Sequence, residues 1–226
     1  MNKIYEKAEE KYAESQIREF PREFEYFGRK FVLQKGVFPP DVFLGSRIYT
    51  PHLPLNEGDV FLDMGCGCGV VGITACIEKN LSKVLCADVS EEAVQNTLEN
   101  VERYNLQDKI SVLKSDIFTN IGEDEKFDLV FWNAPYFDAK PSGDKGFGEM
   151  SYDENYVALK KFIAGADKRL KHGGKIMTGI SSSRVPLENI AKKAKEIGFG
   201  MKIFFQGRDP NGFSQELLEF KKEGGR

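Results

Sequence analysis

The sequence has few residues of the kinds that build metal centres or disulfide frameworks. Its 226 residues include only four cysteines and two histidines, and no two cysteines form a Cys-x-x-Cys pair. Structural zinc sites and disulfide-stapled domains need such ligands clustered at short spacing. We therefore expect no metal site and no disulfide, and we interpret the free thiols as typical of a reducing compartment.

Long apolar runs and an excess of one charge are also missing. No uninterrupted apolar stretch approaches the roughly 20 residues of a membrane span, and the N-terminus, MNKIYEKAEEKYAESQ, is charged where a signal peptide would be apolar. The 32 Lys and Arg against 35 Asp and Glu disfavour a protein that mainly coats nucleic acid or an anionic membrane. The sequence predicts a cytoplasmic protein with no membrane partner. This overall balance still allows a local basic region, since residues 151–226 carry 15 basic and 9 acidic side chains.

Strand-like and helix-like segments alternate from residue 58 onward. An apolar run is followed by the turn GCGCG and a helix-like segment, and the same unit then repeats, with Ser90 as the expected cap of the second helix. This alternation predicts a Rossmann-like, doubly wound α/β fold, with a seven-stranded sheet that is mostly parallel and ends in an antiparallel hairpin. The expected strands cover residues 58–63, 83–88, 109–116, 127–133, 174–180, 200–206 and 214–220, and a helix is expected over about 153–171.

The N-terminal segment does not follow this repeat. A charged, helix-like stretch runs to about residue 20, and a Phe-Gly turn between alternating apolar residues, EFEYFGRKFVLQ, predicts a hairpin. We expect a small helix and hairpin cap over residues 1–57 and an α/β core over residues 58–226. Phe38 and Tyr49, ahead of the core, are candidates to line the ligand pocket, although aromatic residues at such positions more often serve packing.

The glycine turn after the first core strand fits two different cofactor motifs. Residues 67–72 satisfy G-x-G-x-x-G, with Asp88 about 20 residues further on, which is typical of nicotinamide-dependent oxidoreductases. Residues 63–69 instead satisfy D-x-G-x-G-x-G. Both motifs place glycines where the backbone must approach a nucleoside cofactor closely.

Acidic residues at the strand ends distinguish these two cofactors. A carboxylate at Asp63 would repel the pyrophosphate of a dinucleotide, but it can receive the positively charged amino-acid part of S-adenosylmethionine. Asp116 follows the third strand, where it could accept a hydrogen bond from an adenine amine with Ile117 against the ring. These positions favour a methyl donor over a dinucleotide.

A second motif, Asn-Ala-Pro-Tyr, follows the fourth strand, at the sheet edge where open α/β sheets bind ligands. Pro135 removes a backbone donor and holds Ala134 extended. The side-chain oxygen of Asn133 and the carbonyl of Ala134 can then act as two acceptors for a planar NH2 group. Tyr136 offers an aromatic face on which a planar amide or base can stack.

With these motifs, the stretch from about residue 37 to 220 resembles the class I S-adenosylmethionine-dependent methyltransferases that bear an Asn-Pro-Pro-Tyr type of motif. This group includes release-factor glutamine methyltransferases and the exocyclic-amine methyltransferases of adenine and guanine in RNA and DNA. Ala134 departs from the proline of the glutamine methyltransferases, which weakens the release-factor assignment more than the methyltransferase assignment. The resemblance implies that the methionine part of the cofactor is held by Asp63, Gly65, Cys66, Gly67 and Gly69. It implies that Asp88 and Val89 bind the ribose and that Asp116 and Ile117 bind the adenine. The acceptor nitrogen is then bound by Asn133, Ala134, Pro135 and Tyr136, and Asn133 also lies beside the cofactor.

The resemblance implies N-methyl transfer to a planar amide or exocyclic amine nitrogen. Protein glutamine, nucleic acid and small molecules all remain open as acceptors. Two other classes also remain, a nicotinamide-dependent oxidoreductase and a non-catalytic S-adenosylmethionine-binding subunit. Acid–base chemistry by Asp138 or Asp144 is a further alternative, although residues 137–150 are better interpreted as a solvated lid.

Overall fold

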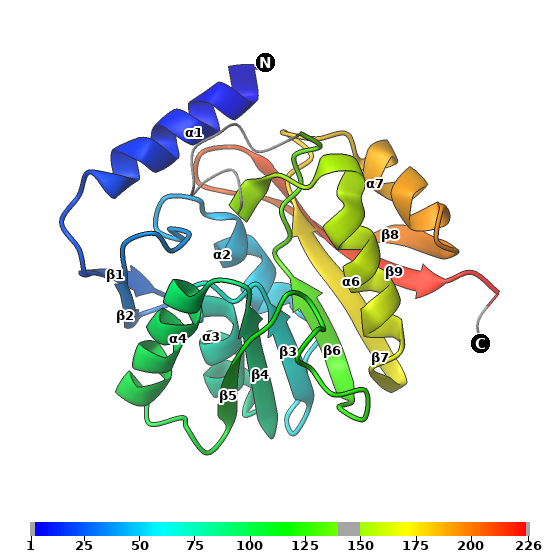
Figure 1. The fold of residues 1–226 in the computed structure, drawn as a ribbon, viewed down its shortest axis with the longest axis horizontal. Coiled ribbons are helices and arrows are strands. Elements are labelled where there is room, and N and C mark those ends of the chain that lie inside the picture. Colours follow the sequence, from blue (N-terminus) through cyan, green and yellow to red (C-terminus); the bar gives the residue numbers. More distant parts are fainter. Residues whose placement is uncertain (1–2, 140–149, 225–226) are drawn as a thin grey trace.

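The computed structural model describes residues 3–139 and 150–224, and Figure 1 shows their arrangement. A seven-stranded sheet with the order β5-β4-β3-β6-β7-β9-β8 forms the centre of the molecule, and a separate hairpin pairs β1 with β2. The strands are β1 (Arg22–Tyr26), β2 (Arg29–Leu33), β3 (Val60–Met64), β4 (Lys83–Asp88), β5 (Ile110–Lys114), β6 (Phe127–Trp132), β7 (Leu170–Ile180), β8 (Phe199–Arg208) and β9 (Ser214–Lys222). The helices are α1 (Lys3–Gln16), α2 (Gly45–Tyr49), α3 (Val70–Lys79), α4 (Glu91–Arg103), α6 (Val157–Asp167) and α7 (Leu187–Lys195), with short 3-10 turns at Thr50–His52 and Glu154–Tyr156.

The sheet confirms the predicted fold class. The strands from β5 through β4, β3 and β6 to β7 pair in parallel, and β9 pairs antiparallel with both β7 and β8. The expected helix over 153–171 was too long, because Leu170 already pairs with Phe127 at the start of β7. The predicted cap of α4 is present, since the Ser90 hydroxyl accepts a hydrogen bond from the amide of Ala93 at 3.2 Å.

Alternate residues of the central strands face opposite sides of the sheet, as the period of a strand requires. In β3, Leu62 belongs to a buried cluster that includes Phe162 of α6 and Ile190 of α7. Its neighbour Phe61 belongs to a second cluster, which includes Ile73 of α3. The sheet is therefore covered on both faces, and the carboxyl ends of its parallel strands are left to form a site.

The N-terminal hairpin is bonded to α4 through a buried asparagine. Asn100 is 0% exposed; its Oδ1 accepts from the amide of Val32 at 2.8 Å, and its Nδ2 donates to the carbonyls of Val32 at 2.8 Å and Cys68 at 2.9 Å. Cys68 lies in the glycine turn. One side chain thus ties β2, α4 and the turn together.

Replacement of Asn100 by Ala should destabilise the protein by about 2–4 kcal/mol, because it removes the side-chain partners of the Val32 amide and the Cys68 carbonyl and leaves the Val32 carbonyl only its bond from Asn96. Urea unfolding followed by far-UV circular dichroism measures this change. Glu102→Ala, at an exposed position of the same helix, is the control and should shift the free energy of unfolding by less than about 0.5 kcal/mol. An Asn100→Ala variant as stable as the control would contradict this account of how the hairpin is attached.

Candidate functional site

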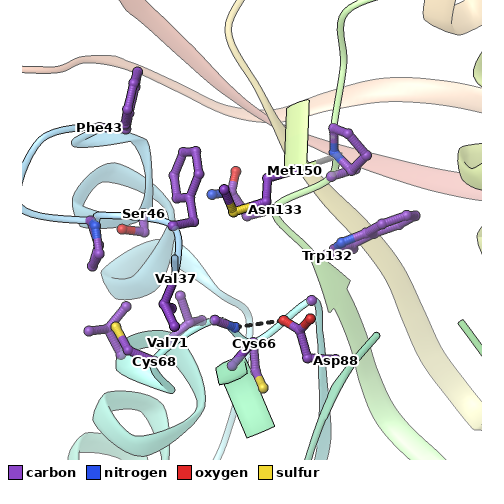
Figure 2. Close-up of a pocket in the computed structure, with 18 of the residues that line it drawn as sticks. Val37, Phe43, Ser46, Cys66, Cys68, Val71, Asp88, Trp132, Asn133 and Met150 are labelled. Atoms are coloured by element: carbon purple, nitrogen blue, oxygen red, sulfur yellow. Dashed lines mark hydrogen bonds between the residues drawn. The ribbon is translucent and has the colours of Figure 1, made fainter. Parts of the chain in front are cut away.

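A cavity of about 860 Å³ lies at the carboxyl ends of β3, β4 and β6. The glycine turn and Asp88 line one end of it, and residues 132–136 line it after β6. Residues 35–49, ahead of the core, form the opposite wall. Figure 2 shows Asp88 and Cys66 at one end of the labelled set and Phe43 at the other, with Asn133 between them.

The three glycines of the turn serve different purposes. All have positive φ, 61° at Gly65, 60° at Gly67 and 81° at Gly69. A Cβ at Gly65 would overlap the Trp132 indole, and one at Gly69 would meet the Thr97 methyl at 2.9 Å. A Cβ at Gly67 would meet nothing nearer than 3.9 Å. Gly65 and Gly69 are therefore required by packing, whereas Gly67 keeps backbone open to the cavity, and Gly69 itself is not one of its lining residues.

Asp88 fixes the turn from the end of β4. Its Oδ2 accepts from the amide of Gly67 at 2.9 Å, and its Oδ1 accepts from the amide of Ser90 at 3.0 Å. Figure 2 shows one hydrogen bond to Asp88 as a dashed line. Burial raises the pKa of Asp88, while the Ser90 and Gly67 amides oppose that shift. Val89 follows it, lines the cavity and is largely exposed.

Asp63 lies deeper, at 2% exposure, near the end of β3. Its Oδ2 accepts from the amide of Gly72 in the first turn of α3 at 2.9 Å. Burial raises the pKa of Asp63 to about 7, the Gly72 amide opposes the shift, and the charge of Asp88 adds to it. The carboxyl group therefore changes its charge near neutral pH.

The Asn-Ala-Pro-Tyr segment follows β6 directly and lines the cavity at all four residues. Asn133 is half-buried, and its side-chain amide bonds to nothing within the described residues. Ala134 is 2% exposed, and its carbonyl likewise accepts no hydrogen bond in the part of the chain that is described. Tyr136 is anchored, because its hydroxyl accepts from Arg184 Nη1 at 3.1 Å. Two acceptors therefore stand unused beside an aromatic ring that is held in place.

Residues 28–196 match the protein family described as Methyltransferase small domain. The chain belongs to this family. A release factor glutamine methyltransferase from Clostridium botulinum is 33% identical over 115 residues, which cover 50% of this chain and 41% of the relative. A ribosomal RNA small subunit methyltransferase C from Mannheimia succiniciproducens is 34% identical over 145 residues, which cover 62% of this chain and 38% of the relative. The matched region thus spans about two fifths of each of these curated relatives.

A solved structure shows the same architecture. The ribosomal protein L11 methylase from Lactobacillus delbrueckii subsp. bulgaricus superposes with a TM-score of 0.60 at 18% identity, and the match covers 92% of both chains. At this identity the likeness bears on the fold, which is the predicted Rossmann-like one. The resemblance inferred from the glycine turn and the Asn-Ala-Pro-Tyr motif is confirmed by the family match.

Two residues expected at the adenine do not line the cavity of this methyltransferase-family chain. Asp116 is exposed, and Ile117, with a φ of 51°, packs half-buried against the core. The cavity instead reaches Lys114 at the end of β5, which pairs with Glu91 at 3.3 Å. Adenine contacts by Asp116 and Ile117 stay a prediction.

Other residues that line the cavity carry no local motif. Phe38 and Tyr49 were considered as pocket residues with packing favoured, and both line the cavity, although Tyr49 is also fully buried. Its hydroxyl donates to the carbonyl of Ile180 at 2.9 Å and is 2.6 Å from Gln215 Oε1. Arg184 and Trp132 line the cavity as well. The pairing of β9 with β7 and the packing of α2 against both bring Tyr49 to the cavity, whereas Trp132 directly precedes Asn133 in the sequence.

The cysteines of the turn are buried, as are all four in the chain, and all are free. Burial raises the pKa of Cys68 to about 12. Within the described ranges, no group of three or more His, Cys, Asp and Glu side chains could hold a metal ion, and no helix is long and apolar enough to cross a membrane. Asp138 Oδ1 accepts from the amide of Asn155 at 2.7 Å, and Asp144 lies outside the described residues.

The raised pKa of Asp63 predicts a pH-dependent stability. Its folded pKa of about 7 exceeds the ordinary value of 3.8, so the folded state binds the extra proton between these values and loses stability as pH rises. Asp63→Asn keeps an acceptor for Gly72 but does not titrate. The variant should therefore gain stability relative to wild type between pH 5 and pH 8, by a few kcal/mol at about 1.4 kcal/mol per pKa unit. Urea unfolding at both pH values measures the difference.

The exposed Asp108→Asn variant is the matched control and should follow wild type at both pH values. If the difference in free energy of unfolding between Asp63→Asn and wild type stayed constant from pH 5 to pH 8, the assigned titration of Asp63 would be wrong.

Proposed function

We propose that the protein transfers a methyl group from S-adenosylmethionine to a planar amide or exocyclic amine nitrogen. The observation that carries the proposal is Asn133, whose amide has no partner among the described residues and lines a cavity shared with the glycine turn. The acceptors named by the two relatives, a release factor glutamine and ribosomal RNA, fit this chemistry.

The residues at the turn end of the cavity fit S-adenosylmethionine. Gly67 leaves a space that a Cβ would fill, beside backbone held by Asp88. Asp63 supplies a carboxyl group that a neighbouring cation would keep ionised, since an opposite charge lowers a raised pKa. We assign the methionine part to Asp63, Gly65, Cys66 and Gly67 and the ribose to Asp88 with Val89, while Gly69 supports the turn from behind.

When bound, the cofactor supplies an electrophilic methyl group, and the protein must position a weak nucleophile against it. The lone pair of an amide or aromatic amine is delocalised, so orientation carries much of the barrier reduction. The Asn133 side-chain oxygen and the Ala134 carbonyl would accept both N–H groups of the acceptor. They would also stabilise the positive charge that builds on the nitrogen, an electrostatic effect of several kcal/mol in favourable sites.

Replacement of Asn133 by Ala should lower methyl transfer by about 100-fold, the usual cost of removing one positioned polar group from an active site. Cofactor affinity should change by less than about threefold, because the turn and Asp88 remain intact. The assay follows tritiated methyl from S-adenosylmethionine into an extract of a strain that lacks the protein, fractionated into protein, nucleic acid and small molecules. Equilibrium dialysis with S-adenosylhomocysteine measures the affinity.

Asn189→Ala, at an exposed position of α7, is the control and should transfer methyl at the wild-type rate. Wild-type turnover by Asn133→Ala would show that the amide does not hold the acceptor. Absence of label from all three fractions with the wild-type protein would overturn the proposed activity itself.

A further inference from the structure

A positively charged side chain lines the cavity at the end beyond Asn133. Arg184, in the segment after β7, is half-buried and donates to the Tyr136 hydroxyl. Its guanidinium carbon also lies 5.7 Å from the ring centre of Phe43 and 5.0 Å from that of Phe213. Three contacts therefore hold the guanidinium next to the aromatic residue of the acceptor motif.

A second cation joins it from the N-terminal helix. Lys11 Nζ lies 5.5 Å from the centre of the same Phe43 ring, and its side chain is half-buried. Burial lowers the pKa of Lys11, and the charge of Arg184 lowers it further, while Asp209 opposes the shift. The two cations are thus close enough to repel each other across one ring.

Neither cation has a carboxylate partner within the residues that the structure describes. Asp209 lines the cavity and acts on Lys11 electrostatically, but its Oδ1 accepts from the amides of Asn211 and Phe213, and its Oδ2 accepts from the Gln215 side chain at 3.0 Å. Asp209 is 5% exposed and forms no ion pair with Lys11 or Arg184. Arg184 therefore lines this end of the cavity together with Asp209, and Lys11, which is not itself a lining residue, adds a second half-buried positive charge at the Phe43 ring. Desolvated cations are costly unless an anion meets them.

We propose that Arg184 and Lys11 bind a phosphate of the methyl acceptor, so that the acceptor is a nucleotide. The inference rests on the proposed function, which places the acceptor nitrogen at Asn133. A nucleotide joins a planar amine and a phosphate in one unit, and the structure places the matching groups at Asn133 and Arg184 with Tyr136 between them. A glutamine side chain within a protein brings no anion of its own.

Two further features support a nucleotide. Arginine presents a planar fork of donors that matches phosphate oxygens and is more weakly hydrated than an ammonium group. Phe38 lines the cavity with a half-buried ring that stacks on Phe43 with centres 5.0 Å apart, and this ring adds an aromatic surface for a base.

Binding measured without methyl transfer tests this assignment. The cofactor end is first saturated with S-adenosylhomocysteine, and adenosine, AMP, guanosine and GMP are then titrated while the fluorescence of Trp132 is followed. Trp132 is the only tryptophan and lines the cavity. At least one nucleotide should bind about tenfold or more tightly than its nucleoside, the effect expected of one charge-assisted hydrogen bond.

The ratio of nucleotide to nucleoside affinity separates charge recognition from a structural role. Arg184→Gln should reduce this ratio to about one, whereas Lys11→Gln and Arg184→Lys should each reduce it only in part, because each keeps one of the two positive charges or its sign. A loss of packing would weaken nucleoside and nucleotide alike and leave the ratio unchanged. Lys7→Gln, one helical turn before Lys11 and exposed, is the matched control and should leave the ratio at the wild-type value.

Other results would overturn the inference. Absence of nucleotide binding, or a ratio that Arg184→Gln leaves intact, would remove the phosphate site. A preference for N-acetylglutamine over N-acetylglutaminamide that depends on Arg184, without a nucleotide preference, would assign the cations to a carboxylate instead. If a single-stranded hexanucleotide binds more tightly than AMP and GMP, the phosphate belongs to a nucleic-acid strand. If the hexanucleotide and the mononucleotides bind equally, the phosphate belongs to a free nucleotide.

The two proposals fail in different ways. A phosphate preference in a protein that transfers no methyl would leave the binding site standing and overturn the proposed activity. Methyl transfer with the same kcat/KM in wild type and Arg184→Gln would leave the proposed activity standing and overturn the phosphate site.

Discussion

Two carboxylates, the buried Asp63 and the half-buried Asp88, hold the turn between β3 and α3, and the rest of the site depends on that turn. Asp63 accepts the amide of Gly72 at the start of α3, and Asp88 at the end of β4 accepts the amide of Gly67. The turn is therefore bonded to both strands beneath it, which fixes its backbone at the cavity wall. Burial raises the pKa of both acids, so this arrangement carries a cost in the folded protein that a bound cation would offset.

The N-terminal part of the chain is coupled to the same turn. Asn100 joins the backbone of Val32 in the hairpin to the carbonyl of Cys68, and Asn96 binds the carbonyl of Val32 at 3.0 Å. The opposite wall, which contains Phe43, is thereby held at a defined distance from the glycines. Loosening of the hairpin would therefore disturb the glycine turn at one end of the cavity as well as the wall that contains Phe43. This coupling explains why three sequence-distant segments can shape one cavity.

The sequence was sufficient for the fold and for the parts of the site that local motifs encode. Strand and helix periodicity, glycines with positive φ and a proline after a buried strand are local properties, so the glycine turn and Asn133 were found. Arg184 was not considered, and Tyr49 was expected mainly to serve packing, because their positions depend on how β9 inserts between β7 and β8. Tyr49 meets Gln215 across 166 positions of the sequence. Asp116 lies outside the cavity because β5 ends at Lys114, a boundary that composition does not define.

Charge is distributed along the cavity in an order that suits the proposed reaction. Asp63 and Asp88 line the turn end, whereas Arg184 lines the cavity beside Tyr136, with Lys11 close by over the Phe43 ring. Figure 2 shows Asn133 between Asp88 and Phe43. A cationic methyl donor and an anionic acceptor would each be attracted to a different end, because charge complementarity fixes orientation as well as affinity. The reverse placement would set like charges against each other at both ends. The cavity would thus select the direction in which the two substrates enter, and that order brings the acceptor nitrogen to Asn133.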